Sequence, residues 1–98
     1  HTLVVPMDEV DNWIDVDPEL ATHLMLVAQR IGRAQVRAFS PARIGLIIAG
    51  MEVPHTHLHV VPIDTEADLH FANANHDASA EQLDAAAAAL VDALDELA

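Results

Sequence analysis

Cysteine and lysine are absent from this chain, and other basic residues are few. Without cysteine there can be no disulfide, no thiolate metal ligand and no cysteine nucleophile. Four arginines stand against 16 Asp and Glu residues, so the formal net charge is −12. Such a charge repels nucleic acid and anionic membranes at long range, and we expect neither as a partner. A small ligand with a phosphate group is still compatible with it, because backbone N–H groups and histidines bind phosphate locally.

Long apolar runs are also missing. No stretch reaches the length of a membrane-spanning helix, and the chain does not open with a charged segment followed by an apolar one. We therefore expect a cytoplasmic protein. The 98 residues suffice for one small domain, which buries a modest part of its surface. Because much of the apolar content is alanine, we expect a second subunit to add to the core.

The predicted elements follow one another as strand, helix, strand, strand, helix, which indicates an α+β fold with one domain over residues 1–98. We predict a strand over 1–5, a helix from the Asp17-Pro18 cap to about Phe39, a buried central strand over 44–49, a strand over 55–63 and a helix that begins at a Ser79–Gln82 capping box. The turn at 50–54 is short enough for an antiparallel hairpin. The first residue falls inside a strand pattern, so we expect the natural protein to be longer.

Three histidines, His55, His57 and His59, alternate with other residues in the fourth predicted element. Successive side chains of a strand point to opposite faces, so the three imidazoles share one face while Thr56 and Leu58 point to the other. Burying several charged imidazoles together is costly. Such a group of histidines therefore indicates a function.

Three interpretations fit these histidines. A neutral imidazole is a good nucleophile toward phosphorus when one ring nitrogen is held as N–H and the other is free, while its neighbours donate to phosphate oxygens. Alternating histidines can also supply two or three ligands to zinc. The third interpretation is a hydrogen-bonded polar patch at a sheet edge.

Two segments together resemble the histidine triad (HIT) superfamily. Val53–Pro62 resembles the family's signature, in which three histidines alternate with mainly apolar residues before two more apolar positions. Thr56 stands at a usually apolar place. His1–Pro6 resembles the family's upstream strand, which reads glycine-histidine, apolar residues, then proline. The two segments occur in the expected order, with the expected helix and strand between them.

The resemblance implies a homodimer of HIT-like domains, each with helices packed on a five-stranded antiparallel sheet. It implies cleavage of a nucleoside monophosphate, often AMP, from an amine, a second nucleotide or another phosphate, with a purine nucleotide as substrate and no cofactor. The middle histidine, His57, would attack the α-phosphate and form a nucleotidyl-histidine. His55 and His59 would position the phosphate and orient His57, and His1 would support the group.

The chain departs from the family pattern in two places. The family's N-terminal strands and its ribose-holding residue have no counterpart, so we expect a missing N-terminal region and a dimer partner to complete the sheet. The segment before the histidines lacks the usual asparagine, and Glu52 replaces a small hydroxyl residue that contacts phosphate. Gly50, Glu52 and Val53 are the candidate substrate-binding residues. The alternative function is a nucleotide- or metal-binding protein with little turnover.

Overall fold

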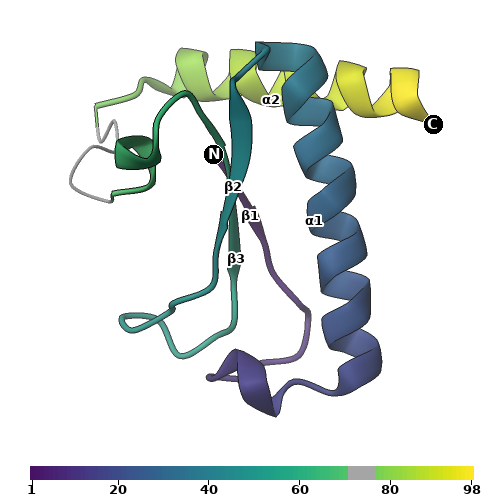
Figure 1. The fold of residues 1–98 in the computed structure, drawn as a ribbon, viewed down its shortest axis with the longest axis vertical. Helices are drawn as coiled ribbons and strands as arrows, with labels where there is room; N and C mark the ends of the chain where they lie inside the picture. The colour runs from purple at the N-terminus through teal and green to yellow at the C-terminus, as the bar shows by residue number, and fades with distance from the viewer. Residues whose placement is uncertain (71–76) are drawn as a thin grey trace.

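The computed structural model describes residues 1–70 and 77–98 and has the predicted α+β architecture (Figure 1). The elements are β1 (Thr2–Val4), the 3-10 helix η1 (Trp13–Asp15), α1 (Pro18–Phe39), β2 (Arg43–Ile47), β3 (Leu58–Ile63), the 3-10 helix η2 (Glu66–Leu69) and α2 (Ala80–Leu97). Within the described residues, no helix combines the length and apolarity needed to cross a membrane.

Both long helices begin where the sequence predicts. The Asp17 side chain accepts the backbone N–H of Glu19 at 2.9 Å, and Pro18 occupies the first helical turn of α1. The same helix ends at Ser40, which adopts a left-handed conformation with φ 49°. Ser79 and Gln82 form the predicted reciprocal capping box of α2. These boundaries are set by local hydrogen bonds, which explains why the sequence alone predicts them.

The three strands form an antiparallel sheet in the order β1-β3-β2. The antiparallel pairing of β2 with β3 is confirmed, but the prediction that residues 44–49 form the central strand is wrong. The central strand is β3, because β1, at the start of the chain, pairs with the edge of β3 that does not contact β2. The short β1 reaches only as far as Val60, so Pro62 lies beyond it, where its missing N–H removes no hydrogen bond to β1.

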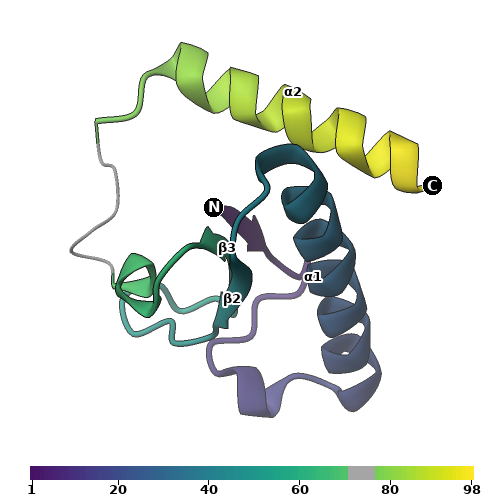
Figure 2. The ribbon, with the colours of Figure 1, turned by 45° about the horizontal axis from the view of Figure 1, so that its top comes forward.

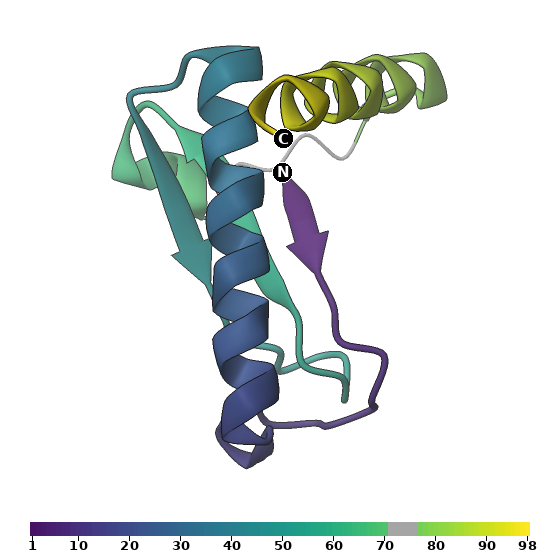
Figure 3. The same cartoon turned by 90° about the vertical axis from the view of Figure 1, so that its right-hand side faces the viewer.

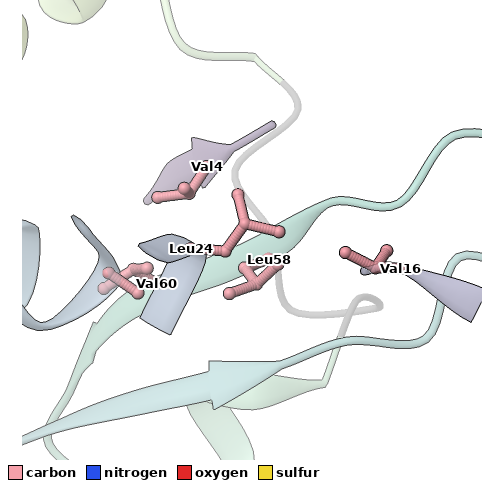
Figure 4. Close-up of a cluster of buried hydrophobic side chains, with 6 residues drawn as sticks. Val4, Val16, Leu24, Leu58 and Val60 are labelled. Carbon is pink, nitrogen blue, oxygen red and sulfur yellow. The ribbon is translucent and has the colours of Figure 1, made fainter. Parts of the chain in front are cut away.

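One face of the sheet, which we call the α1 face, carries the hydrophobic core. Figure 3 shows α1 running along this face. Figure 4 shows the side chains that meet there, among them Val4, Leu24, Leu58 and Val60, all less than 9% exposed. Three more apolar residues of α1, which recur with Leu24 at helical spacing, pack against this cluster: Leu20, Val27 and Ile31.

The opposite face, which we call the open face, is contacted by η2 and overhung by α2. A Cβ atom on Gly45 of β2 would lie 2.5 Å from Cδ2 of Leu69, so this glycine is what lets η2 pack closely on the strand. Figure 2 shows α2 running from the side of η2 to the C-terminal end of α1. Of the residues of α2, only Ala93 is buried, whereas Leu83 is 60% and Leu97 47% exposed.

Candidate active site

The three histidines lie where the chain enters β3. His59 is in the strand, whereas His55 and His57 precede it, so the prediction of a strand from residue 55 is wrong at its start. The reason is that the backbone groups there have other partners: the N–H of Thr56 donates to the carbonyl of Val10, and the carbonyl of His55 accepts from a ring nitrogen. The predicted alternation is nevertheless kept, because Thr56, Leu58 and Val60 are buried while the histidines between them are half-buried.

The hydrogen bonding of His57 fixes its neutral tautomer. Its Nδ1 lies 2.7 Å from the carbonyl oxygen of His55. A carbonyl oxygen can only accept, so Nδ1 carries the proton and donates it. In the neutral ring the lone pair then belongs to Nε2, for which the described residues provide no hydrogen-bond partner. This is the arrangement that a nucleophilic imidazole requires.

His59 is paired with His1 across β3 and β1. Nε2 of His1 and Nδ1 of His59 are 2.8 Å apart, so one of these nitrogens donates and the other is unprotonated. The ring of His59 also meets the ring of His57 edge to face, with 4.9 Å between centroids. Burial, and secondarily the neighbouring His57, lowers the pKa of His59 below its ordinary value of 6.5. His59 is therefore neutral at neutral pH, with its protonation tied to His1.

The segment after β1 holds the first part of the cluster in place. Nε2 of His55 donates to the carbonyl of Pro6 at 2.8 Å. Thr56 donates to the carbonyl of Val10 twice, from its backbone N–H and from Oγ1, each at 2.7 Å. Thr56 is only 3% exposed. The hydrogen bond of its hydroxyl explains why a polar side chain is tolerated at this usually apolar position.

The three predicted substrate-binding residues differ in their closeness to His57. Gly50 lies beside its ring, since a Cβ atom there would be 3.5 Å from Cε1, and it adopts φ +69°, a conformation that favours glycine. Val53 accepts the backbone N–H of His55 through its carbonyl at 2.8 Å, while its side chain is exposed. Glu52 is exposed. The structure thus brings Gly50 and Val53 to the cluster.

The cluster is not arranged as a set of metal ligands. Within residues 1–70 and 77–98, no three His, Asp or Glu side chains are grouped so that they could hold a metal ion. The carbonyl contacts of His55 and His57 do not distinguish the two interpretations, because a histidine that binds a metal through one ring nitrogen also donates its other ring N–H to such a carbonyl.

Gln35 of α1 is a residue that the sequence reasoning missed. It is fully buried, and its Nε2 donates to the carbonyl of Val60 at 2.9 Å and to Oγ1 of Thr2 at 3.2 Å. These partners directly follow His59 and His1, so this side chain ties α1 to the two strand positions that carry the histidine pair. The sequence does contain a signal for this residue. One face of the predicted helix carries Leu24, Ala28, Ile31 and Gln35 at helical spacing, so an amide stands in an otherwise apolar stripe.

Comparisons with known proteins show what the chain is similar to. The family model described as the HIT domain matches residues 1–66. An uncharacterized HIT-like protein from Borreliella burgdorferi is 33% identical over 69 residues, which are 63% of this chain and 50% of that protein. The asymmetrical bis(5'-nucleosyl)-tetraphosphatase of Schizosaccharomyces pombe is 31% identical over 67 residues, 63% of this chain and 37% of that protein. The chain thus spans half or less of the length of these relatives.

Solved structures show the same fold. A histidine triad protein from Marinobacter aquaeolei superposes on 98% of this chain and 74% of its own with a TM-score of 0.75, at 20% sequence identity. One from Bradyrhizobium japonicum covers 94% of this chain and 73% of its own with a TM-score of 0.74, at 21% identity. Because the domain model matches 66 of the 98 residues and includes all four clustered histidines, the chain belongs to the histidine triad (HIT) family.

Proposed function

We propose that the protein hydrolyses or transfers a nucleoside monophosphate group through a covalent nucleotidyl-histidine on His57. The observation that carries the proposal is the 2.7 Å contact between Nδ1 of His57 and the carbonyl of His55. This contact holds the proton on Nδ1 and leaves the lone pair on Nε2 for attack at phosphorus. The Schizosaccharomyces pombe relative is named as a nucleotide hydrolase, which supports the same class of reaction.

The reaction has two steps. The lone pair of Nε2 attacks the α-phosphorus while the bond from phosphorus to the leaving atom breaks, and the leaving atom takes up a proton. Water or another acceptor then attacks phosphorus, the P–Nε2 bond breaks and returns its electron pair to His57, and the proton of the acceptor passes to solvent. Two chemically easier steps thus replace one difficult displacement.

The neighbouring residues have supporting roles in this proposal. His55 places the carbonyl that orients His57 and is itself fixed to Pro6. His59 and His1 form a neighbouring pair that can donate to phosphate oxygens. The φ of Gly50 favours a residue without a side chain, which keeps the space beside Cε1 of the His57 ring open.

The test is mass spectrometry of the full-length protein mixed with an adenosine phosphoramidate, with free AMP measured in the same samples. We expect wild type to release AMP and to carry a mass increase of one AMP, and His57→Ala to show neither. His23→Ala, which removes an exposed histidine of α1, is the control and should behave as wild type. Binding of AMP by wild type without adduct or release would overturn the proposal and favour a nucleotide-binding protein with little turnover.

We also propose that the working unit is a homodimer joined at β2. This strand pairs with β3 on one side, and on the other side it has no partner among the described strands. Beside it, a groove of about 480 Å³ between α1 and β2 exposes apolar side chains such as Met25, Leu26 and Leu46. An open edge next to an apolar groove is a surface that a second copy would cover.

Light scattering tests this arrangement. Wild type should be a dimer, and Leu46→Lys, which puts a charge in the groove, should be a monomer. Val91→Lys, which changes an exposed valine outside the groove, is the control and should remain a dimer.

A further inference from the structure

Gln35 is the only polar side chain of α1 that is buried. It is 0% exposed, and within the described residues its Oε1 has no hydrogen-bond partner. A buried acceptor without a donor costs stability, and an apolar side chain of similar volume would avoid that cost. The amide is therefore a poor choice for core stability alone, and its contribution lies in the partners of its Nε2.

The Nε2 group bridges two strands of the sheet. It donates to the carbonyl of Val60 in β3 at 2.9 Å and to Oγ1 of Thr2 in β1 at 3.2 Å. Thr2 and Val60 are direct cross-strand partners, so both N–H bonds of the amide are directed at one pair of residues. Between α1 and the three strands, the described residues make no other hydrogen bond. The amide bridge thus fixes β1 and β3 relative to each other and to the helix.

A glycine one turn earlier lets α1 come close enough for this bridge. A Cβ atom on Gly32 would lie 3.3 Å from Cγ2 of Ile44 in β2, which is tighter than an ordinary van der Waals contact. Residues three apart share one face of a helix, so the close approach at Gly32 also brings Gln35 toward the sheet. The packing of α1 therefore supports the reach of the amide.

The two bridged residues each follow a histidine of the cluster. His1 directly precedes Thr2, and His59 directly precedes Val60. Successive side chains of a strand point to opposite faces, so the amide holds the strands from the α1 face while the imidazoles lie on the open face. His59 is opposite Leu3 in the register, which makes its contact with His1 a diagonal one. Diagonal neighbours are farther apart than direct partners, so their contact depends more closely on how β1 lies beside β3.

This diagonal contact is short and adjoins the nucleophile. Nε2 of His1 and Nδ1 of His59 are 2.8 Å apart, and the ring of His59 meets the ring of His57 edge to face. A displacement of β1 by about 1 Å would lengthen the nitrogen–nitrogen distance beyond that of a hydrogen bond. The ring of His59 would then lose the partner that holds it beside His57.

We propose that Gln35 and Thr2 are positioning residues for the histidine cluster: their bridge on the α1 face keeps His1 bonded to His59 and so keeps His59 in place beside His57. This inference rests on the proposed function and adds two residues to its machinery. Both act through the strands, because the bridge lies on the face of the sheet opposite the imidazoles.

The test compares variants of the full-length protein by kcat and KM for AMP release from an adenosine phosphoramidate, and by the ¹⁵N magnetic resonance of the histidine rings. Gln35→Met removes both donated bonds at similar volume, Thr2→Val removes one acceptor, and Thr2→Ser keeps the hydroxyl. We expect kcat to fall about 10-fold in Gln35→Met with KM within about 3-fold of wild type. The fall should be smaller in Thr2→Val and absent in Thr2→Ser. The ring nitrogens of His1 and His59 should shift in Gln35→Met and Thr2→Val.

Leu24→Ala is the matched control for a merely structural effect. It empties part of the same core from α1 but removes no hydrogen bond to a strand. The free energy of unfolding should fall at least as much as in Gln35→Met, since a buried leucine loses most of its side chain. At temperatures where the variant is folded, kcat and the ring resonances should stay as in wild type.

Three results would overturn the inference. These are wild-type kcat and ring resonances in folded Gln35→Met, the same in Thr2→Val, and equal changes in Leu24→Ala. Thr2→Val keeps the shape of the side chain, so it decides the question if Gln35→Met does not fold. A wild type that releases no AMP would overturn the proposed function, and the ring resonances of the variants would then decide the positioning role by themselves.

Discussion

Leu58 and His59 are neighbours in β3 and serve opposite faces of the same sheet. Leu58 is 3% exposed and packs in the cluster under α1, while His59 is half-buried on the open face and pairs with His1. The α1 face carries the apolar core and one buried amide, whereas the histidine rings are half-buried on the open face. The comparison shows that the strand alternation separates two tasks: one face stabilises the sheet and the other presents the histidines. Substitutions of apolar residues on the α1 face and of histidines on the open face should therefore affect different measurements.

The largest expected effect is on the open face. His57→Ala should lower kcat/KM for AMP release by about 10⁴-fold, because it removes the nucleophile. The free energy of unfolding should change by less than about 1 kcal/mol, since this half-buried ring is not part of the core. Steady-state kinetics and urea denaturation measure the two quantities. A loss of activity matched by a comparable loss of stability would contradict the separation of the faces.

Leu58→Ala should show the reverse pattern. It empties part of the core under α1, and such truncations lower the free energy of unfolding by about 2–5 kcal/mol. At temperatures where the variant is still folded, kcat/KM should stay within about 3-fold of wild type. Urea denaturation and kinetics on the same preparation check both statements. A cost below about 1 kcal/mol would mean that this face is not the main core.

Thr56→Val tests a polar contact on the buried side. The substitution keeps the shape and the backbone bond to Val10 but removes the Oγ1 bond, so the free energy of unfolding should fall by about 1 kcal/mol. Thr22→Val is the matched control, because the Thr22 hydroxyl donates to the carbonyl of Pro18 on an exposed part of α1. The control should cost less. Equal costs would show that burial does not strengthen the Thr56 contact.

The smallest expected effect is a pH dependence that comes from His59. Its folded pKa lies below the unfolded value of 6.5, so the unfolded state binds more protons in this range. Stability is therefore fully present above pH 6.5 and is lost as the pH falls through the folded pKa. Nuclear magnetic resonance titration should place the midpoint of His59 below 6.5, and the fall in unfolding free energy below this pH should be shallower in His59→Gln. A midpoint above 6.5 would contradict this.

Several features of the fold could be predicted because they depend on neighbours in sequence. The caps at Asp17 and Ser79 and the alternation around His57 follow from hydrogen bonds and strand geometry within a few residues. The identity of the central strand could not be predicted this way. β2 has the more continuous apolar run, but β3 is central because β1 pairs with it from 56 residues away in the chain.

The sequence by itself determined membership of the HIT family, the two helices and the side of β3 on which the histidines lie. Each of these depends on the spacing of residues or on hydrogen bonds between residues close in sequence. Only the tertiary structure decided that His1 meets His59, that Gln35 reaches Val60 and that Leu69 of η2 packs on Gly45 of β2. These contacts join residues 25 to 58 positions apart or separate elements of the fold. Such pairs depend on the tertiary fold, which a pattern of neighbouring residues does not specify.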